Sequence, residues 1–91
     1  MPELLSCWYV YILRCADDSL YTGVTTDTGR RVKEHNQNDR LGAKYTRVRR
    51  PVSLVYRESC NSRSEACKRE AQIKALSRAA KLKLLQATAD Q

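Results

Sequence analysis

The segment WYVYILRCADDSLYTGV, residues 8–24, decides the fold of this chain. Residues 8–14 are β-branched or aromatic almost throughout, as is typical of a strand, and Asp17-Asp18-Ser19 follows as a turn. Residues 20–25 resume the strand pattern. The segment therefore predicts a β-hairpin that carries a tyrosine-centred triplet on each arm, Tyr9-Val10-Tyr11 and Tyr21-Thr22-Gly23.

The length of the hairpin loop decides whether Tyr11 and Tyr21 lie on the same face of the sheet. A two-residue loop sends them to opposite faces, because side chains alternate along each strand. A three-residue loop over residues 17–19 pairs Cys15 with Tyr21 and places both tyrosines on one face. These local residues alone do not choose between the two registers.

The rest of the chain predicts a third strand and several helices. Short polar side chains favour helix N-termini, and a proline is tolerated where a strand begins. A short helix is predicted from the capping residues 26–28 to the Asn-rich run at 36–39, followed by a brief helical turn at 42–46 and a strand at 52–58. A helix of about twelve to fifteen residues should follow the capping box at 62–65, and a last helix should follow Ser77. Three strands with helices packed on them predict one α+β domain over residues 1–91, with a core at about 7–86.

The composition favours a polyanionic partner. Seventeen Lys and Arg residues against ten Asp and Glu residues give a net charge of +7, which favours binding to nucleic-acid phosphates. The charge is uneven, and the expected nucleic-acid-binding residues are Lys44, Tyr45, Arg47, Arg49 and Arg50. No apolar run is long enough to span a bilayer, so we expect a cytoplasmic protein that binds no membrane.

The four cysteines lack the short Cys-x-x-Cys spacing of a zinc site, and we expect them to be reduced packing residues.

Cleavage of a phosphodiester bond requires a deprotonated water, stabilisation of charge on the phosphate and help for the departing oxygen. Tyrosine, with a pKa near 10, is a useful base only beside a group that stabilises the phenolate. Arg31 and His35 stand four apart on one helix face, and Glu70 lies beside a stripe formed by Ala66 and Ile73. The residues that offer the required functions are Tyr11, Tyr21, Arg31 and His35, with Glu70 as the metal ligand.

These residues carry a family resemblance. The triplets at 9–11 and 21–23, followed by Gly-Arg-Arg-Val-Lys-Glu-His at 29–35, resemble the GIY-YIG nuclease superfamily, which is named after the two triplets. The segments at 43–47, 50–56 and 68–74 resemble small stand-alone bacterial members of the YhbQ-like type. The resemblance implies a three-stranded antiparallel sheet flanked by helices, and a single divalent ion, Mg²⁺ or Mn²⁺, for phosphodiester hydrolysis.

The resemblance also assigns roles to residues of this chain. One of the tyrosines, Tyr11 or Tyr21, would be the general base, and both must then share a face, which selects the three-residue loop or an equivalent bulge. Gly23 would let the backbone pass close to these side chains. The remaining implied roles are phosphate binding by Arg31, orientation of a tyrosine by His35 and metal binding by Glu70.

The chain departs from the family pattern at Tyr9, where the first triplet has glycine, and at Thr22, where the second has isoleucine. Many members also use an asparagine after the third helix, and no asparagine follows Asn61 here.

The predicted function is a metal-dependent endonuclease acting on DNA rather than RNA, structure-selective or repair-related, with a protein partner that supplies specificity. The alternative is a nucleic-acid-binding module that has the nuclease fold without catalysis. A third hypothesis is a protein-interaction role for the helical side. Each site residue also has a structural interpretation: the tyrosines pack a strand, and Glu70 pairs with Lys74 at helical spacing.

Overall fold

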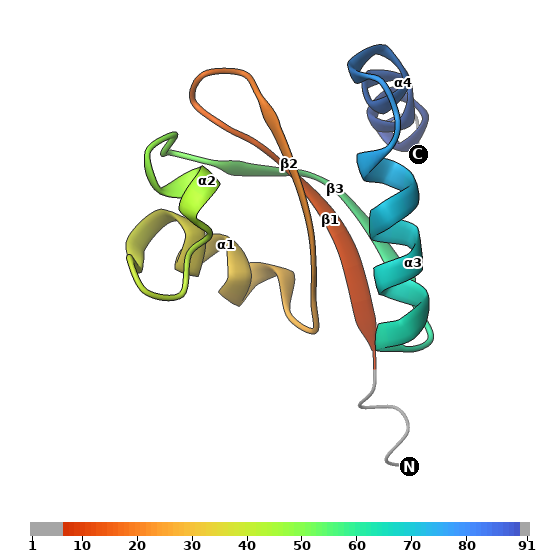
Figure 1. Ribbon diagram of the computed structural model, residues 1–91, viewed down its shortest axis with the longest axis horizontal. Helices are drawn as coiled ribbons and strands as arrows, with labels where there is room; N and C mark the ends of the chain where they lie inside the picture. The colour runs from red at the N-terminus through yellow and green to blue at the C-terminus, as the bar shows by residue number, and fades with distance from the viewer. Residues whose placement is uncertain (1–6, 90–91) are drawn as a thin grey trace.

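The computed structural model describes the backbone of residues 7–89 and the side chains of residues 7–86. Three strands form one antiparallel sheet in the order β2-β1-β3. Helices α1 and α2 lie on one side of the strands and α3 and α4 on the other (Figure 1). The elements are β1 (Trp8–Arg14), β2 (Leu20–Thr25), α1 (Thr28–Gln37), α2 (Lys44–Arg47), β3 (Ser53–Cys60), α3 (Arg63–Lys74) and α4 (Arg78–Ala89). The expected α+β fold with a three-stranded antiparallel sheet is confirmed.

The β1–β2 hairpin has a three-residue loop, one position earlier than predicted. The Cys15 amide donates to the Ser19 carbonyl at 2.9 Å, which leaves residues 16–18 as the loop. Asp18 has a φ of 68°, the left-handed conformation that closes a loop of this length. The predicted pairing of Cys15 with Tyr21 is wrong, because Tyr21 pairs with Leu13.

The one-residue displacement of the loop does not change which tyrosines share a face of the sheet. Tyr11 pairs with Gly23, two residues along each strand from the pair of Leu13 and Tyr21. Because side chains alternate, Tyr11 and Tyr21 lie on the same face of the sheet. A bulge in the β1–β3 pairing between Ile12 and Leu13 leaves this relationship unchanged, since it lies on the other side of β1.

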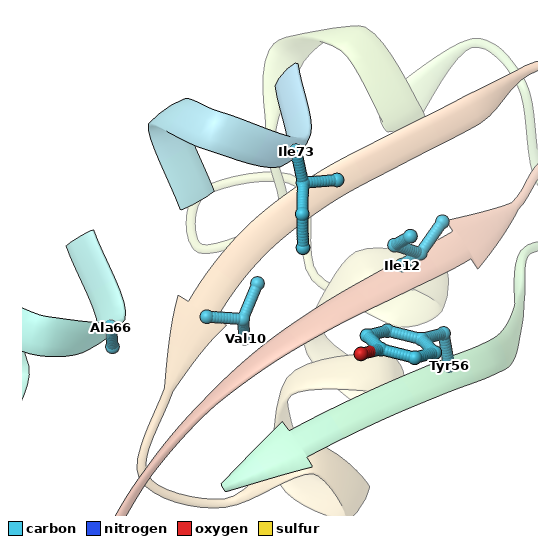
Figure 2. Close-up of a cluster of buried hydrophobic side chains, with 5 residues drawn as sticks. All are labelled: Val10, Ile12, Tyr56, Ala66 and Ile73. Atoms are coloured by element: carbon cyan, nitrogen blue, oxygen red, sulfur yellow. The ribbon is translucent and has the colours of Figure 1, made fainter. Parts of the chain in front are cut away.

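Each face of the sheet has its own hydrophobic core. Figure 2 shows the core under α3, where Val10 and Ile12 of β1 and Tyr56 of β3 meet Ala66 and Ile73 of α3. The opposite face buries Tyr11, Leu13, Cys15 and Val52, with Tyr21 and Val32 packed against them. The predicted catalytic tyrosines therefore belong to the layer under α1 and α2.

Side-chain caps fix the ends of the helices where the sequence predicts them. The Asp27 carboxylate accepts from the Arg30 amide at 3.0 Å, and Ser77 accepts from the Ala80 amide at 3.1 Å. The Ser62 hydroxyl accepts from the Glu65 amide at 3.2 Å. The reciprocal bond of the predicted capping box is displaced by one residue, because the Glu65 carboxylate accepts from the amide of Asn61 instead.

The start of β3 is tied to α1 by a side-chain amide. Asn36 donates to the Val52 carbonyl at 3.0 Å and accepts from the Val52 amide at 2.8 Å. These two bonds satisfy the backbone of a residue that enters the sheet directly after the cis Arg50–Pro51 bond. The connection holds α1, and with it His35, against the sheet.

No helix within residues 7–89 is both long enough and apolar enough to cross a membrane. The four cysteines all lie within the described residues and are free thiols, of which Cys15 is buried.

Candidate active site

A buried chain of hydrogen bonds links the sheet to both small helices. The Tyr11 hydroxyl of β1 lies 2.9 Å from His35 Nε2 of α1. On the other side of the imidazole, His35 Nδ1 lies 2.8 Å from the Thr46 hydroxyl of α2. The Thr46 hydroxyl in turn donates to the Ala43 carbonyl at 3.0 Å. His35 and Thr46 are 0% exposed and Tyr11 is 2% exposed, so water does not compete for these bonds.

Gly23 makes room for the Tyr11 phenol. A Cβ atom built on Gly23 would lie 2.5 Å from the Tyr11 hydroxyl oxygen and 2.7 Å from the ring carbon that carries it. The two residues are direct partners across β1 and β2. The phenol therefore extends across the neighbouring strand, and only glycine leaves the space that it occupies.

Burial controls the protonation of both groups at the centre of the site. Burial raises the pKa of Tyr11 to about 12, although the hydrogen bond and positive charge of Arg31 act in the opposite direction. Burial, followed by the positive charges of Arg31 and Arg50, lowers the pKa of His35 to about 4, against an opposing effect of Glu34. At neutral pH the site therefore holds a protonated phenol against a neutral imidazole.

Tyr21 and Arg31 complete the group on this face of the sheet. The Tyr21 ring meets His35 edge-on, with centroids 5.3 Å apart, and stacks on Tyr45 at 5.9 Å. Arg31 is held by the Glu34 carboxylate at 2.8 Å and by the Leu41 carbonyl. Its guanidinium is close enough to lower the pKa of Tyr11. Four of the five predicted residues, Tyr11, Tyr21, Arg31 and His35, thus lie together.

Glu70 belongs to α3, which packs on the opposite face of the sheet from Tyr11 and Tyr21. It lies between Ala66 and Ile73 on the sheet-facing side of α3, and its side chain is 23% exposed. Its negative charge contributes to the raised pKa of Tyr11, which requires the two groups to be near each other. The same carboxylate accepts an ion pair from Lys74 at 3.2 Å, as the structural interpretation of the sequence expects.

The donor set fits a hydrated divalent ion. Among the side chains of residues 7–86, no three His, Cys, Asp or Glu residues gather into a group that could hold a metal ion. A single carboxylate does fit Mg²⁺ or Mn²⁺, which keep several waters and take one or two carboxylates together with substrate phosphate. Glu70 would hold such an ion.

The predicted nucleic-acid-binding residues divide into exposed and internally bonded groups. Lys44, Tyr45 and Arg47 are exposed on α2. Arg49, by contrast, pairs with Asp17 at 3.1 Å and lies 3.9 Å over the Tyr45 ring. Arg50 donates to the His35 carbonyl at 2.6 Å. It also forms an ion pair with Asp39 at 2.9 Å, so its positive charge already has a partner within the protein.

Thr46 is the member of the hydrogen-bonded chain that the sequence did not reveal. It lies in a basic segment that suggests only phosphate contacts, and no spacing relates it to His35.

The two departures from the triplet pattern are accommodated differently. Thr22 is buried opposite Ile12 in the sheet. Tyr9 is half-buried, with the Arg57 guanidinium 5.1 Å from its ring centroid.

Comparison with known proteins shows which family the chain resembles. The family model of the GIY-YIG catalytic domain matches residues 7–83 of this chain. A UPF0213 protein of Desulfotalea psychrophila is 58% identical over 81 residues, which cover 89% of this chain and 73% of that protein. A UPF0213 protein of Staphylococcus saprophyticus is 53% identical over 77 residues, covering 85% of this chain and 92% of the relative.

Two solution NMR structures share the fold. The UPF0213 protein of Bacillus halodurans is 47% identical with a TM-score of 0.57, covering 89% of this chain and 84% of that one. A protein of E. faecalis is 43% identical with a TM-score of 0.63, covering 94% and 90%. Since the domain match spans nearly all of the described residues and these relatives are small proteins of similar extent, the chain belongs to the GIY-YIG family.

Proposed function

We propose that this protein is a metal-dependent endonuclease that hydrolyses phosphodiester bonds in DNA. The observation that carries the proposal is the Tyr11 hydroxyl, 2.9 Å from a neutral, buried His35 and surrounded by Tyr21 and Arg31. Membership in the GIY-YIG family supports a nuclease with a nucleic-acid substrate. DNA as the substrate and Mg²⁺ or Mn²⁺ as the ion are parts of the proposal.

Tyr11 is the general base in this proposal. As a water molecule attacks the phosphorus atom, its proton passes to the Tyr11 oxygen while the Tyr11 proton passes to His35 Nε2. The P–O bond to the departing oxygen then breaks, and that oxygen takes up a proton from solvent. A pKa of about 12 makes free Tyr11 phenolate rare at neutral pH, so the two proton transfers must be coupled.

Arg31 supplies positive charge where the phosphate gains negative charge. The Arg31 side chain is held by Glu34 and is 23% exposed, so in this proposal substrate phosphate approaches it from the solvent side. A divalent ion at Glu70 would add Lewis-acid stabilisation of the phosphoryl oxygens. Tyr21 packs edge-on against His35 in the same group of side chains.

The surface beside the site fits a phosphate backbone. Helix α2 presents Lys44 and Arg47 to solvent, next to the Tyr21–Tyr45 stack (Figure 1 shows α2 above α1). Exposed cations position a nucleic acid without reading its bases. Structure-selective or repair-related cleavage, with a partner protein that supplies specificity, is consistent with such a surface.

Cleavage assays on purified protein test the proposal. Single-stranded, nicked and branched DNA incubated with Mg²⁺ or Mn²⁺ should be cut, and EDTA should prevent the cut. Tyr11→Phe should lower the rate by about 100-fold or more, the usual contribution of a general base, while DNA binding persists. Glu70→Ala, which removes the proposed metal ligand, should also abolish cleavage. Tyr21→Phe should also lose activity.

Tyr56→Phe is the matched control. Tyr56 lies in the core on the opposite face of the sheet and donates to Glu58 at 2.6 Å, so its loss should leave cleavage unchanged. DNA binding without cleavage of any substrate would refute the nuclease proposal and support the binding-module alternative. Salt-insensitive association with a protein, with no DNA binding, would support the interaction role of the helical side.

A further inference from the structure

We infer that Thr46 is a positioning residue that holds His35 in the tautomer with the proton on Nδ1, so that Nε2 is the atom that accepts from Tyr11. The inference rests on the proposed function for its catalytic consequence. Its primary test is a property of the protein alone.

The direction of the hydrogen bonds follows from the Thr46 hydroxyl. This hydroxyl has one proton, and the Ala43 carbonyl, 3.0 Å away, can only accept it. When the hydroxyl donates to this carbonyl, its oxygen faces His35 Nδ1 at 2.8 Å as an acceptor, and in this arrangement Nδ1 carries the ring proton and donates it. A neutral imidazole has a single ring proton, which leaves Nε2 as an acceptor for the Tyr11 hydroxyl at 2.9 Å.

Thr46 decides the protonation of Nδ1, because the other polar neighbour of this atom favours the opposite state. The Ala43 amide also points at Nδ1, from 3.4 Å, and an amide N–H can only donate. The Thr46 hydroxyl, through the shorter contact, favours an Nδ1 that carries a proton. The Ala43 amide, through the longer contact, favours an Nδ1 without a proton. Without the Thr46 hydroxyl the amide would be the remaining polar neighbour that the structure places at Nδ1, and the ring proton would move to Nε2.

The fold delivers Thr46 to this position through a very short helix. Ala43 and Thr46 are the N-cap and third residue of α2, and the Arg47 amide closes the same turn on the Ala43 carbonyl at 3.0 Å. The Thr46 carbonyl accepts from the Arg49 amide at 2.9 Å. Thr46 is fully buried, so its hydroxyl cannot exchange these partners for water.

The wrong tautomer would disable the proposed proton path. With a proton on Nε2, His35 would donate to the Tyr11 oxygen and could not receive the Tyr11 proton. An orienting group that fixes the tautomer is what a histidine needs to act as a base toward a hydroxyl.

Nitrogen NMR of the imidazole tests the inference directly. His35 is the only histidine in the chain, so a long-range proton–nitrogen spectrum of uniformly ¹⁵N-labelled protein at neutral pH contains one imidazole. We expect a pyrrole-type Nδ1 and a pyridine-type Nε2 in the wild type and in Thr46→Ser. In Thr46→Val, which keeps the shape of the side chain, we expect the two types to exchange.

Each result has a defined meaning. A pyridine-type Nδ1 in the wild type would overturn the inference, and so would an unchanged pattern in folded Thr46→Val. If Thr46→Val does not fold, the wild-type spectrum still decides the tautomer, and Thr46→Ser shows that a hydroxyl suffices.

Cleavage kinetics separate this inference from the proposed function. Thr46→Val should lower kcat by about 10- to 100-fold with little change in KM, and Thr46→Ser should recover most of the loss. A wild type that has the expected tautomer but cuts no DNA would refute the nuclease and leave the tautomer assignment standing. A Thr46→Val protein with exchanged nitrogen types and full activity would overturn the positioning role.

Discussion

The Tyr11 hydroxyl occupies the space that a side chain on Gly23 would fill, with 2.5 Å separating its oxygen from a Cβ atom built there. Gly23→Ala should therefore displace the phenol from His35. We expect a loss of about 1–3 kcal/mol in the free energy of unfolding, as for other overpacked cores, together with loss of cleavage. Urea denaturation and a cleavage assay measure the two effects.

Gly29→Ala is the control for this change. A Cβ atom on Gly29 would meet only the Asp27 carboxylate, at 3.6 Å, and the residue lies in α1, where alanine favours a helix by about 0.5–1 kcal/mol over glycine. It should stabilise the protein slightly and leave cleavage intact. Equal tolerance of alanine at both positions would show that Tyr11 can move without consequence.

His35 should make the protein sensitive to mild acid. Its pKa falls from an ordinary 6.5 to about 4 in the folded state, so folding is favoured above pH 6.5 and loses this stabilisation as the pH falls through the window to about 4. The loss should approach about 3 kcal/mol at the lower end. Urea denaturation across this pH range measures it.

The comparison variant for the acid effect is His35→Gln, which removes the titrating group. It should be less stable than the wild type at neutral pH, and the difference should shrink as the pH falls. Parallel stability curves for the two proteins over this window would mean that His35 is not the group that responds to acid.

Glu70 and Lys74 should affect ion binding in opposite directions. Glu70→Gln removes the proposed ligand and should weaken Mn²⁺ binding by more than about tenfold, since even loss of an outer-shell partner has that effect. Lys74→Gln removes an ammonium that pairs with the Glu70 carboxylate at 3.2 Å and should strengthen binding about twofold. Paramagnetic broadening of amide signals by Mn²⁺ would report both changes. Identical broadening in all three proteins would place the ion elsewhere.

The exposed and internal cations should behave differently on substitution. Lys44→Gln and Arg47→Gln should weaken DNA binding and reduce the slope of log K against log salt by about 0.7–0.9 each, while unfolding stays within about 0.5 kcal/mol of the wild type. Arg50→Gln breaks the bonds to the His35 carbonyl and to Asp39 and should cost about 1–3 kcal/mol of stability.

Fluorescence anisotropy with labelled DNA over a salt series, beside denaturation curves, distinguishes these cases. A steeper loss of DNA binding in Arg50→Gln than in Lys44→Gln, without any loss of stability, would return Arg50 to the nucleic-acid interface.

Local sequence determined the secondary structure and the register of Arg31 with His35. The strand composition of residues 8–14, the caps at Asp27 and Ser62 and the four-residue spacing of Arg31 and His35 act over a few residues, so they can be read without tertiary contacts. The local residues did not choose the hairpin parity. The resemblance to the GIY-YIG family, which requires both tyrosines on one face, selected the correct parity, although the register itself was displaced.

Tertiary packing decided which side chains are available and which proton goes where. The sequence does not show which basic residue is available, yet Arg50 donates to the His35 carbonyl at the end of α1, while Lys44 on α2 is exposed to solvent. The meeting of Thr46 with His35 is likewise a contact across eleven residues between two helices. Burial, which sets the pKa of His35 and fixes its partners, exists only once the sheet and both helices have come together, so it cannot be read from the order of the residues.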